Sequence, residues 1–173
     1  MTSSAWLDQL IVRLETTGEA GETALDFLRQ RRVRVRLRKQ SSSGARWTVF
    51  GNILMNPVFT DGRNDEYALS LLVHEVHHLK QGKHKALSVH GELEAWQVQF
   101  SYLKALTGRY YKIPPHEATI AELMSLSLVD RDHLKRARTL MQKFAGKKYR
   151  VDLFPLYPLL DEIRFQLTGR TMH

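Results

Sequence analysis

Residues 65–82 read DEYALSLLVHEVHHLKQG, and we expect this stretch to form the central helix of the protein. Its apolar residues fall on nearly all sides of a helical projection, which is typical of a buried helix. Residues 74–78 within it fit the pattern H-E-x-x-H. Gly82 is a residue type that commonly ends a helix. We therefore predict a buried helix from about Glu66 to Gln81, with two histidines one turn apart.

His74 and His78 are the first candidates for a functional site. A helix places residues four apart on one face, so both imidazoles can reach one metal ion at about 2.0–2.1 Å. Glu75 is rotated by about 100° and would reach a water molecule on that ion instead of the ion itself. A metal lowers the pKa of such a water, and a nearby carboxylate can accept its proton. The pattern indicates a zinc-dependent hydrolase with Glu75 as general base.

A catalytic zinc site needs a third protein ligand. The chain has no cysteine, and the candidates are His84, His90, Glu92 and Glu94. The helix expected after Ser88 has an apolar stripe made by Val89, Leu93, Trp96, Phe100 and Leu103. Glu92 lies about 60° from Val89 on the flank of this stripe, whereas Glu94 lies about 140° away and should face solvent. We therefore predict Glu92 as the third ligand.

The two histidine alternatives fit less well. His84 stands where a third histidine follows in H-E-x-x-H-x-x-G-x-x-H, but the glycine of this chain is one place late, at Gly82. The segment around it, Lys80–Lys85, also has the composition of an exposed basic loop. His90 lies about 100° from the apolar stripe, in an intermediate position. His84 remains an alternative to Glu92, as does Glu94.

Val73–His78, followed by Gly91–Trp96, resembles the gluzincins, which are zinc peptidases with a glutamate ligand on a following helix. The short chain and the short spacing are most similar to the single-domain minigluzincins. Several gluzincin branches carry this ligand as Glu-x-x-Ala, which matches Glu92 and Ala95. The thermolysin branch has adjacent Glu-Ala, which would match Glu94 instead. The resemblance thus implies a zinc metallopeptidase that acts on peptides or proteins.

The resemblance covers residues 54–106 and has two further implications. Gluzincins often follow the alanine with Asp or Asn, which orients a zinc-bound histidine, but this chain has Trp96 there. The family also has a strand that pairs with extended substrate, and Asn52–Asn56 would be its counterpart. An oxyanion-stabilising Tyr or His is common as well, but spacing selects none of Tyr110, Tyr111, His116, Tyr149 and Tyr157.

The remaining sequence predicts an α+β fold in one domain, residues 1–173, with helix dominating. Period-two alternation favours strands within residues 32–38 and 47–55. Helical spacing favours further helices near residues 3–14, 22–31, 88–107, 118–126, 130–145 and 159–167, with Pro114-Pro115 as a linker. We expect a small antiparallel sheet packed with the metal-bearing helix and the glutamate-bearing helix.

Charge and hydropathy bear on partners and location. Lys and Arg number 26 against 18 Asp and Glu, so the formal charge is +8. Arg32, Arg34, Arg36 and Arg38 alternate with apolar residues. We favour a solvated basic strand face, with nucleic acid or another polyanion as the alternative partner.

No apolar run reaches the ~18 residues of a membrane span, and residues 1–14 lack signal-peptide features. We expect a cytoplasmic protein without a membrane partner. The alternative to a peptidase is a non-enzymatic or latent zinc-binding protein.

Overall fold

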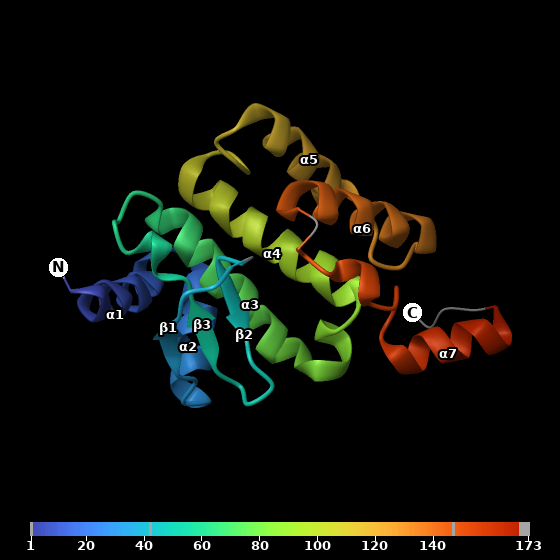
Figure 1. The fold of residues 1–173 in the computed structure, drawn as a ribbon, viewed down its shortest axis with the longest axis horizontal. Coiled ribbons are helices and arrows are strands. Elements are labelled where there is room, and N and C mark those ends of the chain that lie inside the picture. Colours follow the sequence, from blue (N-terminus) through green and yellow to red (C-terminus); the bar gives the residue numbers. More distant parts are fainter. Residues whose placement is uncertain (1, 42, 147, 170–173) are drawn as a thin grey trace.

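The computed structural model describes residues 2–41, 43–146 and 148–169, and it consists mainly of helices (Figure 1). The expected domain, 1–173, includes a few residues outside this described part. With η for 3-10 helices, the elements in chain order are α1 (Ser3–Arg13), η1 (Leu14–Thr16), α2 (Glu19–Gln30), β1 (Val35–Leu37), β2 (Ala45–Trp47), β3 (Ile53–Met55), η2 (Pro57–Phe59), α3 (Asp65–Ala86), α4 (Val89–Thr107), α5 (Pro114–Ser125), α6 (Arg131–Ala145), η3 (Val151–Leu153) and α7 (Leu159–Thr168). The α+β prediction with dominant helix is confirmed.

The sheet has three short strands in the order β1-β3-β2. β2 and β3 form an antiparallel hairpin, and Gly51 supplies the positive φ of 75° that its turn requires. β1 pairs with the other edge of β3 in the parallel direction. The expectation of a purely antiparallel sheet is therefore wrong for one pair: the chain reverses between β1 and β2 and again in the hairpin, so β1 and β3 run in the same direction.

The position of β3 also corrects the expectation for the substrate-pairing strand. Asn52–Asn56 contains β3, which is hydrogen-bonded to a neighbour on each side. A strand with two neighbours has no free backbone edge for a peptide. The edge strand on the side of α3 is β2, since β2 and α3 lie in contact.

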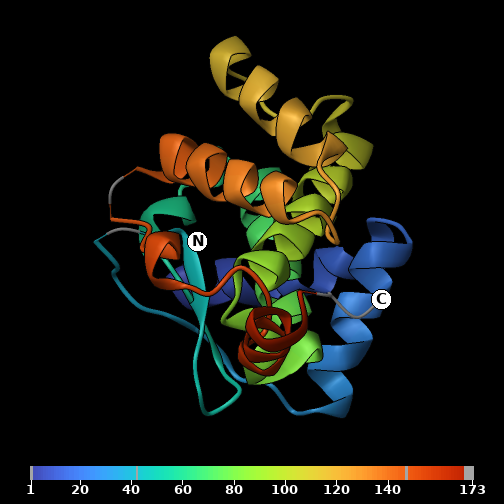
Figure 2. The ribbon, with the colours of Figure 1, turned by 90° about the vertical axis from the view of Figure 1, so that its right-hand side faces the viewer.

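α3 is the central helix, and all residues from Ala68 to Val76 are buried. Gly82, with φ 75°, interrupts its helical backbone, as the sequence predicts, although one further turn continues to Ala86. α3 packs along α4, and Tyr67 contacts both hydrophobic clusters. One cluster joins α1, α2 and the sheet to α3; the other joins α4, α5 and α6. In Figure 2, α5 and α6 cover the upper part of α4, and α2 lies at the opposite end.

Two local predictions about helix starts have different outcomes. Ser88 caps α4 as expected, because its Oγ accepts a hydrogen bond of 3.0 Å from the Gly91 N–H. Pro114-Pro115 are not a linker: they form the first turn of α5. Proline suits that turn because its missing N–H would have no helical partner there.

Among the described residues, no helix combines the length and apolar character that crossing a membrane requires.

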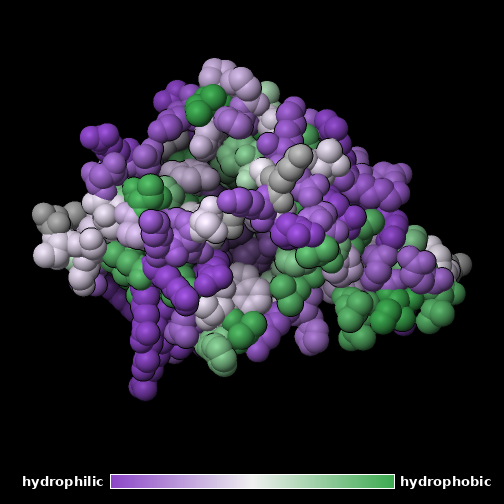
Figure 3. Space-filling model, viewed as in Figure 1, coloured by the Kyte–Doolittle hydropathy of each residue, from purple (hydrophilic) through white to green (hydrophobic). Residues whose placement is uncertain are grey.

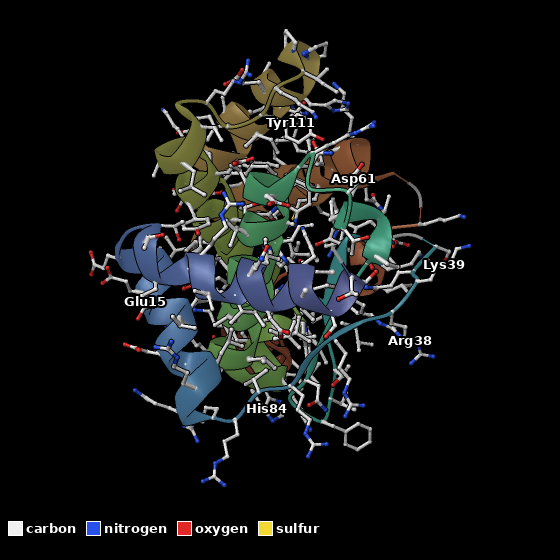
Figure 4. All side chains as sticks on the ribbon, turned by 90° about the vertical axis from the view of Figure 1, so that its left-hand side faces the viewer. Glu15, Arg38, Lys39, Asp61, His84 and Tyr111 are labelled. Carbon is white, nitrogen blue, oxygen red and sulfur yellow. The ribbon has the colours of Figure 1, made fainter. Side chains whose placement is uncertain are left out.

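The basic strand face is present but shorter than predicted. Arg32 has a positive φ of 50° in the turn that ends α2, so the strand begins only at Val35. The four arginines are exposed and alternate with half-buried apolar residues. Figure 4 shows Arg38 and Lys39 extending from the surface at this edge. The positions of these arginines do not show whether nucleic acid or another polyanion binds them. The polyanion alternative therefore stays a prediction.

Candidate metal centre

Three buried side chains from two helices meet where α3 and α4 lie side by side. His74 and His78 come from one face of α3, and Glu92 comes from the first turn of α4. The Nε2 atoms of the two imidazoles are 2.9 Å apart. Glu92 Oε2 is 3.5 Å from His78 Nε2 and 3.9 Å from His74 Nε2. The turn at residues 87–88 brings Glu92 there, because it folds α4 back onto α3.

This arrangement fits a metal ion. Four tetrahedral ligands about 2.1 Å from an ion are about 3.4 Å from one another, and the three observed separations lie on both sides of that value. All three potential ligand atoms lie within 4.8 Å of one another. The atoms that would bind the ion are His74 Nε2, His78 Nε2 and Glu92 Oε2, which lie close to one another between the two helices. Two imidazoles and one carboxylate suit several first-row divalent metals, including zinc.

The charges of the group also suit a cation. Burial, together with the charge of His78, lowers the pKa of His74 to about 3. Burial would lower the pKa of His78 too, but the carboxylates of Glu92 and Glu75 outweigh it and raise that pKa to about 9. Burial opposes ionisation of Glu92, yet His78 lowers the Glu92 pKa. The two carboxylates therefore favour a positive charge at this place, which a divalent cation would supply.

Glu75 is adjacent to the group but outside it. Its buried carboxylate accepts a 2.6 Å hydrogen bond at Oε2 from the backbone N–H of Trp47 on β2. Burial raises the pKa of Glu75 to about 7. A carboxylate with such a pKa can take up and release protons near neutral pH. Sequence reasoning anticipated the place of Glu75, but no sequence signal indicated that Trp47 would fix it.

The other candidates for third ligand lie elsewhere. His84 is exposed beyond the break in α3, and Figure 4 shows it at the far end of that helix. His90 is half-buried against the ring of Tyr157. Glu94 was expected to face solvent, but it is half-buried and its Oε2 lies 2.6 Å from Lys85 Nζ. None of the three belongs to the clustered group, whereas Glu92 does.

Gln81 is a residue of the site that sequence reasoning missed. Its Oε1 is 3.0 Å from His78 Nδ1, and its Nε2 donates to the Gly91 carbonyl and to Glu94. Gln81 thereby orients the imidazole and links α3 to the first turn of α4. Its place three residues after His78 on the same helix is a signal that could have identified it.

Only one of the five candidates for oxyanion stabilisation reaches the group. The Tyr149 hydroxyl donates a hydrogen bond to Glu92 Oε2 and accepts one of 2.9 Å from Trp96 Nε1. The other four have different contacts: Tyr110 N–H binds Glu117, Tyr111 stacks edge-on against Tyr67, His116 packs on Phe144, and Tyr157 donates to the Val129 carbonyl.

A cavity of about 270 Å³ opens beside His74 and Glu75. Its other lining residues are largely apolar or aromatic: Ser43, Gly44, Ala45, Tyr67, Leu71, Trp96, Gln99, Phe100, Phe144, Ala145 and Tyr149. A second cavity, of about 520 Å³, shares part of this lining, including Gly44 and Ala145, and continues past Gln40 and Lys148. Figure 3 shows a hollow near the centre of this face. The candidate metal centre can therefore be reached from a cleft between β2 and the end of α6.

Comparisons with models of known protein families, with curated proteins and with solved structures found no match to this chain. The class that fold and site define is an α+β protein with a buried His-His-Glu group that could bind a metal.

Proposed function

We propose that this chain is a zinc metallopeptidase, that is, a hydrolase that cleaves peptide bonds. The observation that carries the proposal is the position of Glu75. Its carboxylate lies next to the His-His-Glu group, is fixed by Trp47 and lines the same cavity as His74. A zinc site with only a structural role has four protein ligands and needs no such neighbouring base.

Each side chain has one task in the proposed reaction. His74, His78 and Glu92 would hold the zinc ion, which when bound would lower the pKa of a water and polarise the substrate carbonyl. Glu75 accepts the proton of the attacking water and transfers it to the amine nitrogen as the peptide bond breaks. The hydrogen bond from Trp47 holds the carboxylate in place, so little reorientation is needed for either transfer.

The edge of β2 is the proposed binding strand for the substrate backbone. The Gly44 carbonyl and the Thr48 N–H bond to β3, so the alternating residues Ala45 and Trp47 direct their backbone groups outward. The Trp47 N–H points to Glu75, which places this outward edge at the proposed catalytic centre. Because the Trp47 N–H binds Glu75, an extended peptide would add to the sheet through the Ala45 N–H and the carbonyls of Ala45 and Trp47.

Hydrolysis of a quenched peptide library by zinc-loaded wild type and by Glu75→Gln tests the proposal. Glutamine keeps an oxygen that can accept the Trp47 hydrogen bond but cannot accept a proton. We expect unchanged zinc content and hydrolysis reduced at least about a hundredfold, within the ~10²–10⁴ range of general bases. Glu122→Gln, at a solvent-accessible side chain bonded to Arg136, is the matched control and should keep full activity.

Two results would argue against this proposal. Wild-type turnover by zinc-loaded Glu75→Gln would contradict the assigned mechanism. A zinc-loaded wild type that hydrolyses no member of the library would favour the alternative of a non-enzymatic or latent zinc-binding protein.

A further inference from the structure

A chain of two hydrogen bonds leads from the core to the candidate metal ligand Glu92. The indole Nε1–H of Trp96 donates to the Tyr149 hydroxyl, and that hydroxyl donates to Glu92 Oε2. Trp96 lies one turn after Glu92 on α4, whereas Tyr149 comes from the segment between α6 and η3. Residues from distant parts of the sequence therefore converge on one carboxylate.

The direction of each bond follows from the chemistry of the donors. An indole N–H can only donate, so the Tyr149 oxygen must be the acceptor for Trp96. The single hydroxyl proton of Tyr149 is then free to point at Glu92. A carboxylate oxygen has two lone-pair directions, so Glu92 Oε2 can accept this proton and still face the imidazoles.

Packing fixes the first member of this chain. Trp96 is 5 % exposed, and its ring centroid lies 5.5 Å from that of Phe100, 5.3 Å from Phe144 and 5.8 Å from Tyr149. These aromatic contacts restrict rotation of the indole. The donor therefore stays directed at the Tyr149 hydroxyl.

The hydrogen-bond partners of the candidate ligands are unequal. His78 has Gln81 and Glu92 has Tyr149, whereas His74 Nδ1 has no partner among the described residues. Trp96 acts on the carboxylate ligand through the Tyr149 hydroxyl.

We propose that Tyr149, oriented by Trp96, is a positioning residue that holds the Glu92 carboxylate toward the metal and sets the affinity of the site. This inference rests on the proposed metal centre. It differs from a role in which the Tyr149 hydroxyl stabilises the substrate oxyanion, because its only proton is used by Glu92. Outer hydrogen-bond partners of metal ligands typically account for about 10–100-fold in metal affinity.

The test is the zinc dissociation constant, measured by competition with a chromogenic chelator, for wild type, Tyr149→Phe, Trp96→Phe and the double variant. We expect Tyr149→Phe to weaken zinc binding about 10–100-fold. Trp96→Phe should weaken it when Tyr149 is present but add nothing in the Tyr149→Phe background, since it acts through that hydroxyl. The visible spectrum of the cobalt-loaded protein should change in both single variants.

Tyr157→Phe is the matched control, because its hydroxyl bonds the Val129 carbonyl outside the candidate centre, and zinc affinity should not change. Wild-type zinc affinity in Tyr149→Phe would overturn the inference, and a simultaneous loss of turnover would assign Tyr149 to the substrate. If Trp96→Phe weakened zinc binding equally in both backgrounds, Trp96 would not act through the Tyr149 hydroxyl. A wild-type protein that binds no divalent metal would contradict this inference and the proposed function together, whereas the preceding results contradict the inference alone.

Discussion

Replacing Gly91 by alanine perturbs the junction that brings Glu92 to the two histidines. A Cβ at this position would lie 2.0 Å from the Lys85 carbonyl oxygen and 3.1 Å from Ala86 Cα. Ordinary contacts of a Cβ begin at about 3.4 Å, so α4 and the end of α3 would have to separate by about 1.4 Å. Because the obstacle is backbone, no side-chain rotation can relieve the clash.

Two opposing effects determine the free energy of unfolding of Gly91→Ala. Alanine favours helix over glycine by up to about 1 kcal/mol. Overpacking a dense interior costs about 1–3 kcal/mol, and a backbone clash belongs at the upper end of that range. We therefore expect a net loss of about 1–2 kcal/mol, which lowers Tm by about 2–8 °C in a chain of this size. Movement of the first turn of α4 should also displace Glu92 and weaken zinc binding.

Thermal unfolding with and without zinc measures both effects. Ser101→Ala, at an exposed position of the same helix, is the control, and its stability should stay within about 0.5 kcal/mol of wild type. A Gly91→Ala protein that melts at or above the wild-type temperature would refute the reasoning. It would mean that helix propensity outweighs the contact between the two helices.

Two further predictions concern charge. The His77 imidazole, the Lys85 ammonium at 2.6 Å and the Gln81 amide at 2.8 Å lower the pKa of Glu94 below its usual value. The ionised form of Glu94 therefore stabilises the fold, so wild type should unfold at a higher denaturant concentration than Glu94→Gln at pH 7. This difference should shrink as the pH falls below about 4.5, where the unfolded chain takes up the proton first. A constant difference down to pH 2 would contradict this prediction. For the exposed arginines at positions 32, 34, 36 and 38, fluorescence anisotropy should detect only duplex binding that fades steeply with salt. Strong sequence preference at physiological salt would show specific recognition instead.

The sequence was most informative where one helix carries both pattern and chemistry. The apolar residues around His74 and His78 predicted a buried helix, and the angular position of Glu92 on the next helix predicted which acid would approach them. Both inferences depend on helical periodicity, which is a local property. That is why α3, α4 and the relative positions of these three residues could be anticipated.

Contacts between distant segments could not be anticipated in this way. Tyr149 was one of five equivalent candidates, because its contact with Glu92 depends on how α6 packs against α4. The hydrogen bond from Trp47 to Glu75 uses a backbone N–H, which almost every residue type has. The identity of residue 47 therefore gives no indication of this contact. The parallel pairing of β1 likewise follows from chain topology, which the alternation of residues within one strand does not encode.

The central claim is that His74, His78 and Glu92 together bind zinc. Crystals grown with zinc and measured at its absorption edge test this claim most directly, because anomalous scattering locates the ion. We predict one anomalous peak about 2.0–2.2 Å from His74 Nε2, His78 Nε2 and a carboxylate oxygen of Glu92. A peak held by His84 or Glu94 instead, or no peak beside the three residues, would contradict the claim.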